Sequence, residues 1–201
     1  MIYSTIVLGW LGILLFLLIL LSFKKMAKNN EYALLHLMQA IMYTMWLPLP
    51  FAFYQLLDSD ILLVGSVFGS VYLILLVVGV ALQTGHLAFI SKYNEDKKIS
   101  DSQTNYMMAT LSHPYEGLVN VFKCIWALFL GIFFFQNGET VMAGWMFLFG
   151  LFIIYYLIII LEASLIIRLS FFEKVKPNTI FVNIEPFLFF LTLMIYITFN
   201  F

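Results

Sequence analysis

The chain has 201 residues, of which 63% are apolar, 18% aromatic and only 10% charged, and its formal net charge is −1. Soluble domains average about 45–50% apolar and about 25% charged residues, so this composition excludes an ordinary soluble domain and predicts an integral membrane protein. The one cysteine, Cys124, excludes an intramolecular disulfide and a zinc site built from cysteines. Nucleic acid is not an expected partner, because the basic residues lie between apolar segments and form no patch.

Apolar segments long enough to cross a membrane recur along the whole chain. Crossing a hydrocarbon core of about 30 Å takes about 20 helical residues. We therefore expect one all-α transmembrane domain over residues 1–201, with six spans at residues 5–23, 32–57, 61–90, 114–136, 140–169 and 179–200. The first segment has no basic residue before it and no small-residue cleavage site after it, which predicts a permanent span and not a signal peptide.

The basic residues predict the orientation of these spans. Lysine and arginine lie at the connections between spans 1 and 2, 3 and 4, and 5 and 6, with Lys123 early in span 4. The remaining connections carry only the acids Asp58, Asp60 and Glu139. Because short basic loops stay in the cytoplasm, we expect both termini outside and the longest loop, between spans 3 and 4, inside. The expected location is the cytoplasmic (plasma) membrane of a bacterium.

The longest polar interval, Lys92–Ser112, has no apolar periodicity. It predicts a solvated loop at residues 94–110, with a short helix at the membrane surface as the alternative.

Prolines and glycines inside the spans predict local features. Pro48 and Pro50 predict a kink in span 2, and Pro186 one in span 6, because a helix that began after Pro186 would be too short to cross. Gly65 and Gly69 form a GxxxG pair in span 3, which predicts close packing of another helix. A second copy of the chain or a membrane-protein partner on this pair is the less favoured alternative.

Ionisable side chains inside a bilayer are costly, so each one is a candidate for function. At about 1.5 Å of rise per residue, Lys123, Glu162 and Glu185 lie roughly 9–14 Å inside the predicted cytoplasmic boundary, and His36 and His86 about 7–9 Å. The opposite half has no ionisable side chain other than tyrosines. This distribution predicts a polar pocket that opens to the cytoplasm and is closed on the outer side.

Helical spacing of three, four or seven residues places polar side chains on shared faces. These stripes are His36, Gln39 and Tyr43; Gly79, Gln83 and His86; Glu116, Asn120 and Lys123; and Tyr155 and Glu162. The residues that we expect to bind a ligand are Lys123, Glu162, Glu185, His86, His36 and Asn120, with His113, Glu116 and Gln83 at the rim.

Structural roles for the same residues stand beside these functional ones. Lys123 can extend toward the interface or pair with Glu162 or Glu185 as a packing device. Glu185 can be satisfied by local backbone at the Pro186 kink. The sequence SHPYEG at 112–117 is a good helix start, with His113 as the cap.

The favoured function is the binding or translocation of a small, ionic or lipid-like ligand from the cytoplasmic side. A non-catalytic subunit of a membrane complex, which binds another membrane protein, is one alternative. A second is a haem site between His36 and His86, because imidazole pairs are suitable axial ligands.

A membrane enzyme is the remaining alternative. SHPYEG, then LEASL at 161–165 and VKP at 175–177, resembles the motifs of the isoprenylcysteine and phospholipid methyltransferase superfamily. The resemblance implies S-adenosylmethionine as cofactor, contacted by His113, Tyr115, Gly117 and Glu162. The chain differs from the family pattern in having Ser112 at the arginine position and one glutamate instead of two.

Overall fold

The computed structural model describes residues 1–93, 97–166 and 178–201, which are helical apart from short turns. Within these ranges, six helical stretches are long and apolar enough to cross a membrane. They are α1 (Ile2–Lys28); α2 and α3 (Tyr32–Trp46 and Leu49–Leu57); α4 (Asp60–Tyr93); α5 and α6 (Lys97–Met107 and His113–Gln136); α7 and α8 (Thr140–Leu151 and Ile153–Ser164); and α9 (Thr179–Asn200). By the length and composition of its helices, the protein is the all-α integral membrane protein that the sequence predicts.

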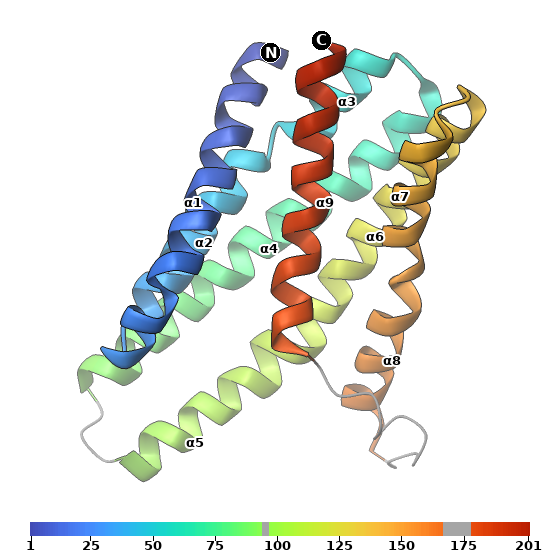
Figure 1. The fold of residues 1–201 in the computed structure, drawn as a ribbon. Helices are drawn as coiled ribbons and strands as arrows, with labels where there is room; N and C mark the ends of the chain where they lie inside the picture. The colour runs from blue at the N-terminus through green and yellow to red at the C-terminus, as the bar shows by residue number, and fades with distance from the viewer. Residues whose placement is uncertain (94–96, 167–177) are drawn as a thin grey trace.

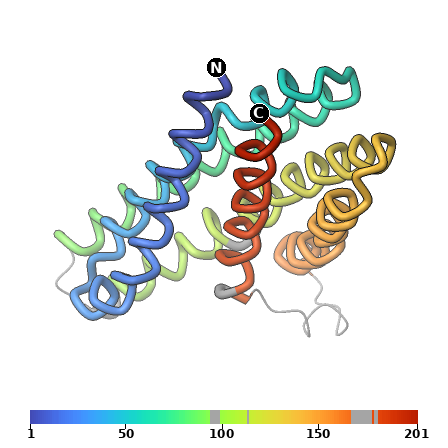
Figure 2. The backbone as a smooth tube through the Cα atoms, turned by 45° about the horizontal axis from the view of Figure 1, so that its top comes forward, coloured from blue at the N-terminus to red at the C-terminus, as the bar shows by residue number. Residues whose placement is uncertain are grey.

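The helices form a bundle with α9 between two groups. Helices α1 to α4 make one side and α6 to α8 the other, and α9 runs between them (Figure 2). The closest helix pairs are α2 with α4, α4 with α6, and α6 with α7. The N- and C-termini lie at the same end of the bundle (Figure 1).

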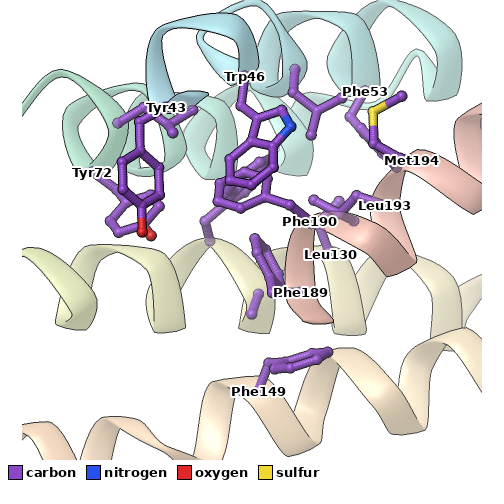
Figure 3. Close-up of a cluster of buried hydrophobic side chains, with 14 of the residues drawn as sticks. Tyr43, Trp46, Phe53, Tyr72, Leu130, Phe149, Phe189, Phe190, Leu193 and Met194 are labelled. Carbon is purple, nitrogen blue, oxygen red and sulfur yellow. The ribbon is translucent and has the colours of Figure 1, made fainter. Parts of the chain in front are cut away.

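Large aromatic side chains fill the space around α9. Phe189 and Phe190, both fully buried, lie between Trp46 of α2 and Phe149 of α7 (Figure 3). The Phe190 ring stacks on Trp46 with centroids 4.1 Å apart, and the Phe189 ring meets the edge of Trp126 at 5.2 Å. Because aromatic rings bury more area than any other side chain, the rings packed around α9 supply much of the packing energy of the core.

The prolines act largely as the sequence predicts. Helix α2 ends at Trp46 and α3 begins at Leu49, with Pro48 and Pro50 at the junction. The carbonyl of Pro50 accepts a hydrogen bond at 2.8 Å from the hydroxyl of Ser66 in α4, so a side chain of a neighbouring helix serves the backbone at this junction. Helix α9 begins before Pro186 and contains it, as its length requires.

The GxxxG pair of α4 packs against α6 of the same chain. A Cβ atom at Gly69 would lie 2.6 Å from Trp126, and one at Gly65 would lie 2.9 Å from Phe129. The predicted close packing is therefore confirmed within the chain. A second copy or a partner protein remains a prediction, and it would need another surface.

The interval Lys92–Ser112 differs from the favoured expectation. Helix α4 continues to Tyr93, α5 covers Lys97–Met107, and a π-helical turn at Met108–Ser112 joins α5 to α6. The solvated loop is wrong for these residues, and the short helix is what the structure has. Residues 94–96 of that prediction lie outside the described residues, and residues 97–112 contain no glycine or proline that would disfavour a helix.

The fifth span is also shorter than predicted. A turn at Phe152 divides it into α7 and α8, and α8 ends at Ser164, not at residue 169. Residues 167–169 of that prediction lie outside the described residues.

Candidate functional site

An ion pair lies inside the bundle between Lys123 of α6 and Glu185 of α9. The two side chains are 0% and 3% exposed. The hydroxyl of Tyr156 donates to the same carboxylate oxygen, Oε2, at 3.0 Å, and the Lys123 ammonium lies 5.1 Å from the centre of the Tyr156 ring. Of the two partners that the sequence offers Lys123, the structure has Glu185.

Tyrosines from three other helices lie within electrostatic range of this carboxylate. Glu185 interacts electrostatically with the hydroxyl groups of Tyr43, Tyr72 and Tyr156, which come from α2, α4 and α8. Tyr43 and Tyr72 are both buried, and their hydroxyl ends both point toward α6 (Figure 3). We add Asn120, which lies three residues before Lys123 on α6, and call the group the Glu185 cluster: Tyr43, Tyr72, Asn120, Lys123, Tyr156 and Glu185.

Several polar atoms of the Glu185 cluster have no hydrogen-bond partner. Among the described residues, the buried side-chain atoms without one are Ser70 Oγ, Tyr72 OH, Asn120 Oδ1 and Glu185 Oε1. All but the first belong to the cluster. Leaving a buried polar atom unpaired costs about 1–3 kcal/mol, so proteins rarely gather such atoms in one place without a use for them.

Helical geometry places these atoms at a similar depth. Asn120 and Lys123 are three residues apart and share a face of α6, and a lysine side chain points toward the N-terminal end of its helix, here toward Asn120. Gly69 of α4 packs on Trp126 of α6. Because α4 and α6 are antiparallel, Tyr72, three residues after Gly69, is level with Lys123, three residues before Trp126.

A second polar group adjoins the cluster one turn nearer the start of α6. Gln83 of α4 donates its amide to Glu116 Oε1 at 2.9 Å and to the carbonyl of Leu111 at 2.8 Å. The Ser112 hydroxyl donates to the same Glu116 oxygen at 3.2 Å. These bonds join α4, the π-helical turn and α6. They bring together Gln83 and Glu116, two of the three residues expected at the rim.

The histidines have partners of their own. His36 Nδ1 lies 2.8 Å from the carbonyl oxygen of Tyr32 in the same helix, and His86 Nε2 lies 3.4 Å from the carbonyl of Gln103 in α5. His113 begins α6, but its side chain lies outside the described part of the structure. These contacts do not draw His36 or His86 into the Glu185 cluster.

Glu162 is half-buried near the end of α8, and among the described residues it makes no ion pair. The structure therefore identifies Glu185, and not Glu162, as the partner of Lys123, a choice that the sequence leaves open.

Sequence reasoning missed Tyr72 and Tyr156. The stripe expected on span 5 contains Tyr155, whose hydroxyl instead accepts the backbone N–H of Asn178 at 3.0 Å. Tyr156, one position further along, reaches Glu185. No signal in the sequence distinguishes the two tyrosines, because both lie in an unbroken apolar run.

Two residues that the methyltransferase resemblance implies have packing roles. The Tyr115 hydroxyl donates to the carbonyl of Leu75 in α4, and Gly117 lets Ile160 of α8 approach α6 closely. Both contacts hold helices together at this end of α6.

Comparison with known proteins gives no match: no family model fits the chain, and neither a curated protein nor a solved structure is significantly similar to it.

Proposed function

We propose that the protein binds a small polar or ionic ligand at the Glu185 cluster, within the membrane, as a carrier or receptor. The observation that supports this most is the buried Lys123–Glu185 pair whose surroundings keep three polar atoms unpartnered. A ligand that completes those hydrogen bonds recovers the cost of leaving them unpaired.

A purely structural ion pair is the competing interpretation. Buried pairs contribute little net stability and can serve to fix the packing of helices. Such a device works best when every polar atom around it is satisfied, as in the Glu116 group, where Oε1 receives two bonds. Glu185 Oε1 and Asn120 Oδ1 receive none, which favours a binding role.

We further propose that both termini lie outside and that the cluster is reached from the cytoplasm, in the cytoplasmic membrane. The support is the placement of the lysines. Lys24, Lys25 and Lys28 follow the first span, and Lys92 follows the third. The charged residues at the connections between spans 2 and 3 and between spans 4 and 5 are all acidic.

A thermal-stability screen tests the proposed function. The full-length protein in mild detergent is unfolded by heating, with tryptophan fluorescence as readout, in the presence of amino acids, simple amines, sugars, carboxylates and inorganic ions. We expect at least one class to raise the Tm of the wild type but not that of Glu185→Gln. Stabilisation that is equal in both proteins for every compound contradicts the proposal.

The chain offers a matched control for this screen. Glu139 accepts a tyrosine hydroxyl at 2.9 Å, from Tyr196, as Glu185 does from Tyr156, but it lies in the turn between α6 and α7. Glu139→Gln should keep the ligand response. Because Glu185→Gln leaves Lys123 unpaired, the double variant Lys123→Met, Glu185→Leu repeats the test without a buried lone charge.

The same preparation addresses the enzyme and haem alternatives. S-adenosylmethionine belongs in the screen, and a rise in Tm that depends on Glu162 instead of Glu185 would favour the methyltransferase alternative. A Soret band in the visible spectrum would favour haem.

A further inference from the structure

We propose that the ligand of the Glu185 cluster is a small organic cation whose ammonium group donates hydrogen bonds to Glu185 Oε1 and Asn120 Oδ1. This inference rests on the proposed function and names the chemical class that the same cluster takes.

The first support is the type of the unpartnered atoms. A carboxylate oxygen and an amide oxygen accept hydrogen bonds and do not donate them. The orientation of the Asn120 amide is set by its Nδ2, which donates to the carbonyl of Glu116 at 2.8 Å and leaves Oδ1 on the other side. Asn120 and Glu185 are each 3% exposed, so bulk water does not form hydrogen bonds with these oxygens. Tyr72 OH, the third unpartnered atom, can donate or accept and so does not select between ligands; the two oxygens that only accept both lack a donor.

The second support is the balance of charge. Glu185 and Glu116 carry two negative charges, and Lys123 carries one positive charge. The two carboxylates adjoin the same face of α6, because Glu116, Asn120 and Lys123 share that face and Lys123 pairs with Glu185. Gln83 and Ser112, which bond Glu116, are neutral donors and leave its charge in place. Glu116 is half-buried and Glu185 is 3% exposed, so the surplus of acidic over basic side chains favours a cation over an anion at this position.

The third support is the way the cluster already binds an ammonium group. The Lys123 ammonium is held by one oxygen of Glu185 and lies over the ring of Tyr156. The other oxygen of Glu185, Oε1, has no hydrogen-bond partner among the described residues. Aromatic faces attract ammonium groups when water is excluded, so the cluster already shows that a carboxylate oxygen and a tyrosine ring can hold an ammonium group here.

Three-carbon probes of different charge test the inference with the full-length protein. We would measure the Tm by tryptophan fluorescence with propylammonium chloride, propionamide, sodium propionate, β-alanine, and sodium or potassium chloride at equal ionic strength. At roughly ten times its Kd, propylammonium should raise the Tm by about 3–6 °C, and the other probes should have little effect.

Asn120→Leu is the diagnostic variant, because it removes one acceptor and keeps the ion pair. We expect it to lose most of the propylammonium response. Asn200→Leu is its control: Asn200 donates to the carbonyl four residues earlier, at 2.9 Å, as Asn120 does, but at the far end of α9. This control should respond like the wild type.

The outcomes separate the inference from the proposed function. If propionamide, propionate or β-alanine stabilises the protein through Glu185 and propylammonium does not, the ligand class is wrong and the proposed function stands. Stabilisation by sodium or potassium alone also overturns the ammonium assignment. If no probe and no compound of the wider screen acts through Glu185, both proposals fail. An unchanged response in Asn120→Leu overturns the role of Asn120.

Discussion

Lys123 and Glu185 are 62 positions apart in the chain, and their side chains meet inside the bundle. The pair joins α6 to α9 at a depth where neither charge is exposed to water. Removing one partner therefore has a different consequence from removing both.

The single variants Lys123→Met and Glu185→Leu should each lower the free energy of unfolding by about 3–5 kcal/mol, because each leaves a buried charge unpaired. The double variant should recover most of this loss, since two apolar side chains of similar size replace the pair. Chemical unfolding in detergent, arranged as a double-mutant cycle, measures the coupling. A double variant that is no more stable than the single variants would contradict a buried ion pair between Lys123 and Glu185.

Tyr156→Phe removes a hydrogen bond to a charged acceptor and should cost about 1.5–3 kcal/mol. Tyr72→Phe is the matched comparison, because the Tyr72 hydroxyl is buried without a partner. That variant should be neutral or slightly more stable. Chemical unfolding in detergent measures both free-energy changes. Equal changes in Tyr156→Phe and Tyr72→Phe would show that the hydrogen bond from Tyr156 to Glu185 adds no stability.

Gly69→Ala should destabilise the protein by about 1–3 kcal/mol, because the added methyl group would lie 2.6 Å from the buried ring of Trp126. Gly85→Ala lies in the same helix, where no atom comes within 4 Å of the new Cβ. It should be neutral or stabilising by up to about 1 kcal/mol, as alanine favours helix over glycine. If Gly69→Ala is as stable as Gly85→Ala, the α4–α6 contact is looser than described.

The proposed orientation predicts the behaviour of reporter fusions. Alkaline phosphatase, which is active only outside the cytoplasm, should be active when fused after Phe201 and inactive when fused after Tyr93. A green fluorescent protein fused at the same positions should show the reverse pattern. The opposite result at both positions would invert the orientation and would move the Glu185 cluster to the outer half of the membrane.

The spans could be predicted from the sequence because a run of about 20 apolar residues matches the thickness of the hydrocarbon core. Their boundaries are harder to predict. The sequence between Lys92 and Ser112 has the polarity of a loop and no long apolar run, so the length and hydropathy that locate the spans do not indicate α5.

The candidate site could be predicted in part. The stripe of Glu116, Asn120 and Lys123 follows from spacing along one helix, and the structure keeps it on one face. The choice of Glu185 over Glu162 depends on which helices adjoin α6 and how they are rotated, and this information is not local. For the same reason the sequence could not select Tyr156 over Tyr155.

The central position of α9 has a consequence for how the protein is made. Its side chains meet every other span: Phe187 stacks on Phe16 of α1, Phe190 lies by Trp46 and Tyr72, and Phe189 by Trp126 and Phe149. Synthesis proceeds from the N-terminus, so the first five spans enter the membrane before this helix exists. Until α9 is in place, Trp46, Trp126 and Phe149 lack the rings of Phe189 and Phe190, and Lys123 lacks the counter-charge of Glu185. The final 22 residues of helix thus complete both the apolar core and the ion pair in one late step of assembly.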